Sequence, residues 1–254
     1  MTTISFLNRK GGVGKTISCM NIGACLASYG KKVLLIDLDP QANMTQQFGM
    51  YSHSGEHKSM FDVFCRNIPL KDIIRETNSK NLSLAPSHLS LDDADTYLFS
   101  TISREFILSH ELSKLKDYYD FVFIDCPPSK NILTINALAA TDYCVLPFIS
   151  NEFGLDSLRS MAEVITEIRT KIRSDLKIAG LLPSIKANTK VQNIYYDAIV
   201  KELPYEVLPP VRRTTIVDES LNFHQPLIEC APDEGVTKDF EAVTKRLLEI
   251  VEKE

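Results

Sequence analysis

Short apolar runs alternate along this chain with longer segments in which apolar residues recur every three or four positions. The short runs are apolar at consecutive positions, which is typical of parallel strands that are covered on both faces. We therefore expect six buried strands, at residues 4–7, 33–36, 82–85, 121–124, 143–146 and 176–182.

The longer segments have the spacing of helices. Between residues 155 and 172 the apolar positions fall on one helical face, and most charges lie elsewhere. Other helices are expected at residues 17–29, 59–66, 71–76, 89–98, 102–115, 131–140, 191–203, 214–220 and 237–253. Strands that alternate with helices predict an α/β fold, in which a doubly wound, mostly parallel sheet carries helices on both faces. No linker or repeat interrupts the pattern, so we expect a single domain over residues 1–254.

Composition and charge narrow the class of protein. Of the 254 residues 44% are hydrophobic and 24% are charged, and the net charge is −5. These values are ordinary for a globular protein, and a nucleic-acid contact would need a local basic patch. No apolar stretch approaches the ~18 residues of a membrane span, and the N-terminus does not read as a signal peptide. The six cysteines show no CxxC pair or metal-ligand spacing, which predicts reduced thiols in a cytoplasmic protein.

The strongest chemical signal follows the first strand. Residues 8–16 read N-R-K-G-G-V-G-K-T and stand between a strand and a helix, which is the context of a phosphate-binding loop. Glycines let backbone N–H groups turn toward an anion, and the next helix directs its positive end at that anion. In such a loop Lys15 would reach the outer phosphates and the Thr16 hydroxyl would ligate Mg²⁺. The plain pattern G-x-x-x-x-G-K-[ST] wants glycine where this chain has Arg9, and a second lysine, Lys10, begins the loop.

Carboxylates end two of the predicted strands. Asp37 and Asp39 follow the run at 33–36, and Asp125 ends the run at 121–124. The carboxyl ends of parallel strands form the ligand edge of an open sheet, so these residues are expected at that edge. An aspartate that ends an apolar strand is typical of a Walker B position, which holds Mg²⁺ or its water.

With both signatures in place, the chain resembles the ParA family of partition ATPases, within the ParA/MinD group of dimeric ATPases with a deviant Walker A motif. The resemblance runs from about residue 3 to residue 250 and is weakest at 45–100. It is carried by K-G-G-V-G-K-T at 10–16, G-K-K-V-L-L-I-D-L-D-P-Q-A-N at 30–43, Y-D-F-V-F-I-D-C-P-P-S at 119–129, and an acidic residue followed by Pro-Leu at 219–227.

The resemblance implies roles for residues at matching positions. Lys10 would act in trans on a partner's nucleotide, together with Lys15, and Asp39 would orient the attacking water. Thr16, Asp37 and Asp125 would organise Mg²⁺. The phosphates would be cradled by Lys10, Gly11, Gly12, Val13, Gly14, Lys15, Thr16 and Ile17. The nucleoside would lie near Pro209, Pro210 and Arg212.

The family also implies an activity and partners. We expect a slow Mg²⁺-dependent ATPase that forms a homodimer with ATP, binds DNA non-specifically for plasmid or chromosome partitioning, and becomes nucleoid-associated when ATP-bound. A ParB-like centromere-binding protein would stimulate it. Candidate DNA contacts are Lys186, Lys190, Arg212, Arg213 and Lys238. The chain starts almost at its first strand, without the N-terminal DNA-binding extension of larger plasmid ParA proteins, so operator binding is not expected.

The sequence departs from the family at Arg9, where glutamine is usual, and at Ile17-Ser18, where threonines are usual. Neither change removes a loop lysine or Thr16, so nucleotide binding should survive. Lys130 stands after Pro-Pro-Ser, where an apolar residue is common.

Four alternatives share parts of these motifs. A MinD-like ATPase that cycles on the membrane would end in a helix with a basic polar face, but residues 241–254 carry four glutamates against three basic residues, so no stable membrane association is expected. An iron–sulfur reductase would need cluster cysteines near the dimer axis, but Cys126 and Cys144 lie in or next to expected strands. A tyrosine kinase would need a C-terminal cluster of tyrosines, and no tyrosine follows Tyr205. A nucleotide-sensing regulator with little turnover stays open, because Asp39 alone does not guarantee hydrolysis.

Overall fold

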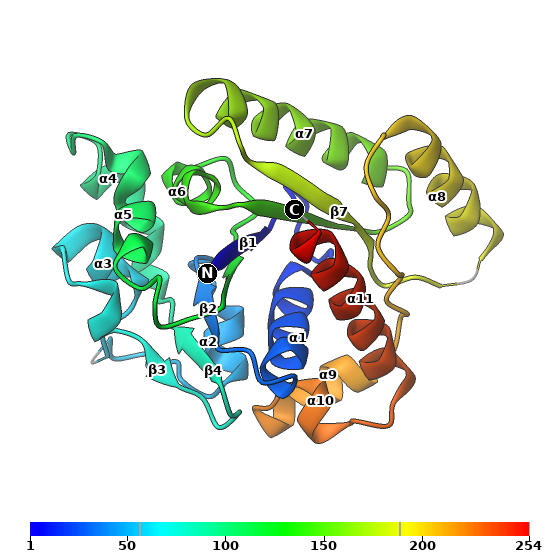
Figure 1. The fold of residues 1–254 in the computed structure, drawn as a ribbon, viewed down its shortest axis with the longest axis horizontal. Helices are drawn as coiled ribbons and strands as arrows, with labels where there is room; N and C mark the ends of the chain where they lie inside the picture. Colours follow the sequence, from blue (N-terminus) through cyan, green and yellow to red (C-terminus); the bar gives the residue numbers. More distant parts are fainter. Residues whose placement is uncertain (56, 188, 254) are drawn as a thin grey trace.

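A seven-stranded sheet forms the centre of the molecule (Figure 1). The computed structural model describes residues 1–55, 57–187 and 189–253, apart from the side chains of residues 218 and 221, so residue 254 of the predicted domain lies outside it. The strand order is β3-β4-β2-β5-β1-β6-β7, and only the β3–β4 pair among these described strands is antiparallel. The strands are β1 (Thr2–Phe6), β2 (Val33–Asp37), β3 (Arg75–Glu76), β4 (Leu82–Ala85), β5 (Phe121–Asp125), β6 (Tyr143–Phe148) and β7 (Lys177–Pro183). The doubly wound, mostly parallel sheet predicted from the sequence is confirmed.

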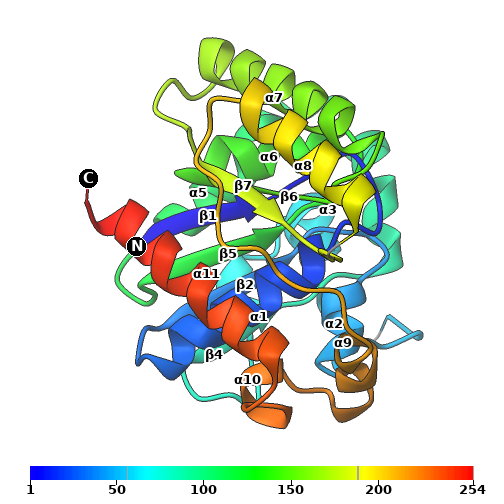
Figure 2. The same cartoon turned by 90° about the vertical axis from the view of Figure 1, so that its right-hand side faces the viewer.

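Helices cover both faces of this sheet (Figures 1 and 2). They are α1 (Lys15–Ser28), α2 (Asn43–Gln47), α3 (Met60–Arg66), α4 (Ala94–Tyr97), α5 (Ile107–Ser113), α6 (Ile132–Ala140), α7 (Gly154–Lys171), α8 (Lys190–Glu202), α9 (Ile216–Ser220), α10 (Leu227–Cys230) and α11 (Gly235–Glu252). Short 3-10 helices occupy Leu70–Asp72, Leu89–Asp93, Arg104–Phe106 and Leu221–Phe223. One face packs against α3 to α8, and the other packs against α1, α2, α10 and α11.

The apolar strands serve both layers because successive side chains point to opposite faces. In β2, Leu34 and Ile36 join the core under α3 to α8, whereas Val33 and Leu35 join the core under α1 and α11. This explains why the strands read as uninterrupted apolar runs rather than as alternating patterns.

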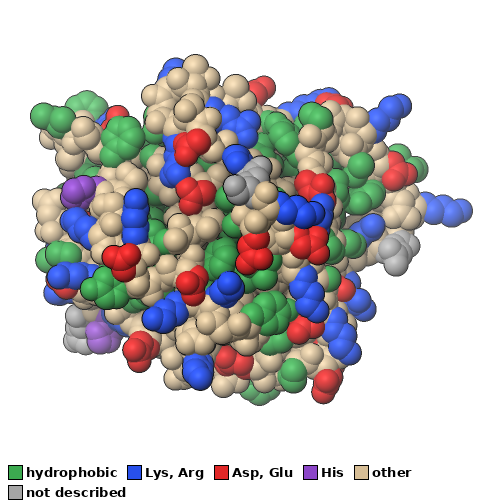
Figure 3. Space-filling model, in the orientation of Figure 1, with side chains coloured by type: hydrophobic (Ala, Val, Ile, Leu, Met, Phe, Trp, Pro, Cys, Tyr) green, Lys and Arg blue, Asp and Glu red, His purple; other side chains and the backbone are tan. Residues whose placement is uncertain are grey.

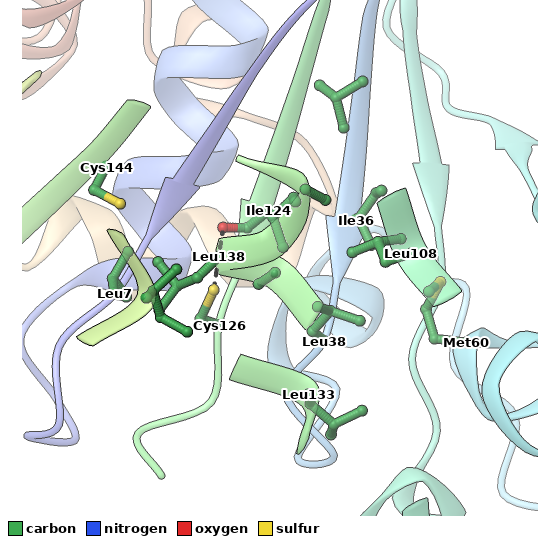
Figure 4. Packing of buried hydrophobic residues seen from close by; sticks show 14 of the residues in the cluster. Leu7, Ile36, Leu38, Met60, Leu108, Ile124, Cys126, Leu133, Leu138 and Cys144 are labelled. Atoms are coloured by element: carbon green, nitrogen blue, oxygen red, sulfur yellow. Dashed lines mark hydrogen bonds between the residues drawn. The ribbon is translucent and has the colours of Figure 1, made fainter. Parts of the chain in front are cut away.

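Two cysteines belong to the first of these cores. Figure 4 shows Cys126 and Cys144 among leucine and isoleucine side chains, with the Cys126 Sγ atom 3.9 Å from the Ile124 carbonyl oxygen. Both thiols are fully buried, and burial raises the pKa of each well above its usual value. They behave as small hydrophobic side chains.

The C-terminal helix α11 packs back on the body of the molecule, against α1 and β7. Its buried apolar residues are Val236, Phe240, Val243 and Leu247. The face that a membrane-surface helix would insert into lipid is therefore used internally. Among the described residues, no helix is both long and apolar enough to cross a membrane.

The predictions between residues 70 and 115 were partly wrong. The helix expected at 71–76 is a single 3-10 turn, after which Arg75 and Glu76 extend and pair with β4. Leu70 and Ile73 enter the core, and the open edge of β4 offers hydrogen bonds to the residues that follow. The helix expected at 102–115 is shortened, because Ser103 adopts a left-handed conformation (φ 54°) and a 3-10 turn precedes α5.

Candidate functional site

The Gly-rich loop joins β1 to α1 at the carboxyl edge of the sheet. Gly12 and Gly14 have φ values of 71° and 81°, a left-handed conformation that glycine adopts at little cost. Helix α1 begins at Lys15, and within the described chain no side chain caps its N-terminus. Its first backbone N–H groups are therefore available to an anion.

A cavity of about 800 Å³ opens above this loop. Several elements far apart in sequence line it: the loop and the start of α1, the segments that follow β2, β5 and β7, α2, the segment 211–217, and α11. The predicted site residues that line the cavity are Gly11, Gly12, Gly14, Lys15, Thr16, Ile17, Asp39, Arg212 and Arg213. The structure thus brings both ends of the predicted nucleotide site together around one hollow.

Other predicted residues lie elsewhere. Val13 is buried beneath the loop, and Pro209 and Pro210 are absent from the described cavity lining, Pro210 being exposed. The lining at the far end is formed instead by residues just after the two prolines, including Val211 and Thr214.

Asp125 and Asp37 lie side by side because β5 and β2 pair in register at these positions. Both are fully buried, and neither Asp125 carboxylate oxygen has a hydrogen-bond partner among the described residues. Burial, together with the neighbouring Asp37 charge, raises the pKa of Asp125 well above its usual range, while the Thr16 side chain and the Lys15 ammonium oppose this shift. Carboxylate and hydroxyl oxygens are the ligands that Mg²⁺ prefers, so this unpaired carboxylate beside Thr16 fits a magnesium site.

Asp37 is held more tightly than its neighbour. It accepts hydrogen bonds from the Thr45 backbone N–H (2.9 Å), from the Thr45 hydroxyl (2.7 Å) and from the Asp39 N–H (3.2 Å). Burial raises the pKa of Asp37 to about 7, and these hydrogen bonds oppose the rise because they stabilise the charged carboxylate. Asp37 therefore fixes the loop that carries Asp39 to the start of α2.

Asp39 stands at the cavity wall. Its side-chain Oδ1 atom accepts a hydrogen bond from the Gln41 N–H at 3.0 Å, and its carbonyl oxygen accepts one from the Ser87 hydroxyl at 2.8 Å. These bonds hold the carboxylate in place and still leave it on the cavity lining.

Lys15 reaches from the base of α1 into the same region. Its side chain is largely buried, and its Nζ atom donates to the Lys10 carbonyl oxygen at 3.3 Å. Burial lowers the pKa of Lys15, while the charges of Asp125 and Asp39 raise it. An ammonium with this little competing contact is well placed for a phosphate.

Lys10 points in a different direction. Its Nζ atom lies 5.0 Å from the centroid of the Phe153 ring and 3.5 Å from the Asn151 Oδ1 atom, both in the connection between β6 and α7. Lys10 is not among the described residues that line the cavity. The two lysines of the loop thus serve different surfaces.

Sequence reasoning missed two supports of the site. One is Thr45, which holds Asp37. The other is Ser184, which follows β7 and is buried; its hydroxyl lies 2.5 Å from the Val13 carbonyl oxygen and 3.0 Å from the Phe148 carbonyl oxygen. A lone serine after an apolar run carries no signal that it will meet a loop more than 170 residues earlier.

Three of the predicted DNA-contact residues come together beside the cavity. Lys186 and Arg212 lie opposite each other in an isolated parallel bridge, and the Arg213 N–H donates to the Lys186 carbonyl oxygen at 3.1 Å. Arg212 forms a bidentate ion pair with Asp239 (2.6 and 2.8 Å), so its charge is already matched. Arg213, Lys186 and Lys238 have no ion pair among the described residues.

Sequence similarity to known proteins covers the part of this arrangement that carries the Gly-rich loop and the three aspartates. A family model described as AAA domain matches residues 1–178, which include the Gly-rich loop, Asp37, Asp39 and Asp125. The sporulation initiation inhibitor protein Soj of Bacillus subtilis is 40% identical over 179 residues, covering 70% of this chain and 70% of Soj. The chromosome-partitioning ATPase Soj of Treponema pallidum is 37% identical over 179 residues, covering 70% of this chain and 69% of that protein.

Similarity to solved structures covers nearly the full chain. Cobyrinic acid a,c-diamide synthase from Mycobacterium smegmatis, solved with bound ADP and magnesium, superposes with a TM-score of 0.87 at 26% identity. The match covers 99% of this chain and 95% of that one.

Proposed function

Because the chain belongs to the ParA family of partition ATPases, we propose that it is an ATP-driven dimerisation switch for plasmid or chromosome partitioning. The observation that carries the proposal is the single cavity in which Lys15, Thr16 and Asp39 meet above the buried Asp125 carboxylate. Relatives named as partition ATPases support the biological role, and a neighbour solved with ADP and magnesium supports ATP and Mg²⁺ as the ligands.

Nucleotide binding follows from the residues at the loop. The N–H groups at the start of α1 and the Lys15 ammonium would hold the phosphates, and the Thr16 hydroxyl with Asp37 and Asp125 would hold Mg²⁺ or its waters. Magnesium supplies neutralising charge on the phosphate oxygens when it is bound. The raised pKa values of the two aspartates are a cost in the free protein that a divalent cation would offset.

Hydrolysis would depend on Asp39. Its carboxylate is held by the Gln41 N–H and lines the cavity, where it can orient a water molecule toward the outer phosphate. We propose slow turnover, as suits a timer, with acceleration by a ParB-like partner.

Dimerisation would complete the site. The Lys10 ammonium lies outside the cavity of its own subunit, beside the exposed Phe153 ring, which supports a role in trans. A cation supplied by a second subunit is worth ~10³ to 10⁵ in rate in related phosphoryl-transfer enzymes. Turnover would then be tied to the meeting of two ATP-bound subunits.

DNA binding would follow from dimerisation. Lys186 and Arg213 lie together at the surface and lack ion pairs among the described residues, so two subunits would present a doubled patch to the DNA phosphates. Such a dimer would associate with the nucleoid within the cytoplasm. The internal packing of the α11 apolar face favours this role over membrane cycling.

The proposal is tested by the mass of the protein in solution and by its binding to DNA. Light scattering should give the mass of one 28.6 kDa chain with ADP and twice that mass with ATP and Mg²⁺, and only the second form should bind random-sequence DNA. A monomer under both conditions, or DNA binding that ignores the nucleotide, would contradict it. Co-sedimentation with anionic liposomes should stay at background, and ATP-dependent sedimentation would favour a membrane-cycling ATPase instead.

A further inference from the structure

A second surface of the molecule carries apolar side chains that no described element covers. It is formed by residues 89–106, which include α4 and two 3-10 turns; we call it the 89–106 surface. Phe99 is 82% exposed and Ile102 is 92% exposed, and Leu89, Tyr97 and Phe106 are exposed beside them. In Figure 1 this segment lies at the upper left, and hydrophobic side chains gather at the same corner of Figure 3. Five large apolar groups within eighteen residues exceed the scattered exposure of an ordinary surface.

A hollow adjoins the same surface. It has a volume of about 330 Å³ and lies between the end of α3 and the start of α5. Its walls are half apolar and half polar: Val63, Ile68, Phe106 and Ile107 on the one hand, and Asn67, Ser103, His110 and Glu111 on the other. Phe106 belongs both to the hollow and to the 89–106 surface. The combination of a pocket with exposed apolar neighbours is typical of an anchor site in a protein interface.

Most of the charges in the 89–106 segment are negative. The segment carries Asp92, Asp93 and Asp95, all exposed, and the half-buried Glu105. Its one basic residue, Arg104, directs its guanidinium at the carbonyl oxygens of residues 98 and 99. The Phe61 ring contacts Tyr97 of the surface, and the Arg66 guanidinium lies over the same ring. The charge of Arg66 is paired with Asp62 of its own helix, α3. Excess carboxylates repel DNA phosphates and anionic lipid alike, and they attract basic peptide segments.

We propose that the 89–106 surface docks a partner-protein segment that has apolar anchor residues flanked by lysine or arginine. One anchor would fill the hollow beside Phe106, others would cover Phe99 and Ile102, and the basic flanks would face Asp92 and Asp93. This site is distinct from the nucleotide cavity, since none of these residues lines that cavity.

The surface is linked through α6 to the loop that follows β5 and Asp125. The Asp95 carboxylate accepts a hydrogen bond from the Ile132 N–H at 3.2 Å, and the Asn136 side chain bonds the N–H of Leu108 (3.1 Å) and the carbonyl oxygen of Arg104 (2.8 Å). Helix α6 begins directly after the loop that follows Asp125, and Pro128 of that loop lines the nucleotide cavity. An occupant of the surface can therefore alter turnover; this part of the inference rests on the proposed ATPase function.

Binding is tested with a defined probe and the full chain. The probe is a fluorescein-labelled helical peptide with leucine on one face and lysine on the other, and the comparison peptide has glutamate in place of lysine. Fluorescence anisotropy should show saturable binding of the lysine peptide and no binding of the glutamate peptide. The Phe99→Ser/Ile102→Ser and the Asp92→Lys/Asp93→Lys variants should each weaken it by about tenfold or more. Tyr118→Ser, which removes an exposed aromatic ring elsewhere, should leave it unchanged.

Three outcomes would overturn the docking proposal. They are equal binding of both peptides, unchanged binding by the variants, and a self-association of the wild type that Phe99→Ser/Ile102→Ser abolishes, since the occupant would then be a second copy. All substituted side chains are exposed, so circular dichroism should show folded variants. ATP turnover measured with saturating peptide tests the link through α6. A bound peptide that leaves the rate unchanged refutes that link, whereas a wild type without any turnover refutes the proposed ATPase function and leaves the binding result intact.

Discussion

The Lys10 ammonium lies 5.0 Å from the centroid of the Phe153 ring, although its own backbone carbonyl accepts a hydrogen bond from Lys15 beside the nucleotide cavity. One residue of the loop thus faces inward through its backbone and outward through its side chain. A cation over an exposed aromatic ring is worth only ~0.5–1 kcal/mol. The contact with Phe153 therefore orients the Lys10 ammonium but is weak enough to be exchanged for another partner. This outward position of the Lys10 side chain is the observation that supports its proposed role toward a partner subunit.

The first prediction concerns this lysine alone. Lys10→Ala should bind ATP about as tightly as the wild type, because Lys15 and the loop N–H groups are intact, but it should lose ATP-induced dimerisation. A fluorescent ATP analogue and light scattering measure the two properties. Arg9→Ala is the matched control, since Arg9 is exposed and bonds Ser160 on the outside of the fold. A variant that dimerises normally with ATP would show that Lys10 has another role.

The second prediction concerns pH. The pKa of Asp37 is raised from 3.8 to about 7 by burial, so between these values the folded state keeps a proton that the unfolded state has released. Without Mg²⁺ and nucleotide, the free energy of unfolding should therefore fall as pH rises from about 4 to 7, by about 4 kcal/mol for this group. Asp37→Asn should remove that part of the slope. Urea unfolding at pH 5 and pH 8 in a chelator measures this change in the free energy of unfolding. The same change for Asp37→Asn and for the wild type would refute the assignment.

The third prediction concerns Ser184, which connects the end of β7 to the Gly-rich loop through the Val13 carbonyl oxygen. Ser184→Ala leaves that buried carbonyl without this partner, which should lower the stability by about 1–2 kcal/mol and loosen the loop. We expect a several-fold rise in KM for ATP with little change in kcat, because Ser184 positions the loop and lies apart from Asp39. Ser113→Ala, at an exposed position, is the control. A fall in kcat at constant KM would argue against a positioning role.

The fourth prediction concerns Arg213, the one of two adjacent arginines whose charge is not matched by an ion pair among the described residues. Arg213 has no ion pair among the described residues, whereas Arg212 is paired with Asp239. Arg213→Ala should weaken DNA binding of the ATP form and reduce the slope of log affinity against log salt by ~0.9 for each subunit that loses a phosphate contact. Lys116→Ala changes the net charge equally at a distant exposed position and should leave the slope unchanged. Equal effects of Arg213→Ala and Lys116→Ala on DNA binding would contradict the prediction and indicate a response to net charge alone.

Local signals are enough to predict much of the fold. Apolar runs such as the one at 33–36 have to be buried on both faces, and this requirement alone predicts a parallel sheet covered by helices. The Gly-rich loop and the aspartates at strand ends are also short-range patterns, so their shared edge of the sheet was predictable.

What the sequence did not reveal depends on long-range contacts. Nothing near Ser184 or Thr45 indicates that they will support the loop and Asp37, and nothing near Arg212 indicates that Asp239 will match its charge. The β3 strand was missed for a similar reason, because its conformation comes from the open edge of β4 rather than from its own residues. Pro209 and Pro210, expected near the nucleoside, are not among the described residues that line the cavity, and their nucleoside contact stays a prediction.

The central claim is that each catalytic site uses Asp39 from one subunit and Lys10 from the other, and mixing two inactive variants tests it directly. Lys10→Ala and Asp39→Ala should each lower Mg²⁺-dependent phosphate release by about 10² or more. In an equal mixture, a heterodimer contains one site with the intact Asp39 of the first variant and the intact Lys10 of the second. The account predicts that heterodimers restore activity well above that of either variant, because each heterodimer carries one complete site of two; if half of the dimers are heterodimers, the rate reaches roughly a quarter of the wild-type rate. A mixture that forms heterodimers by light scattering and yet stays as inactive as its components would place Lys10 and Asp39 in the same subunit's site and contradict the account.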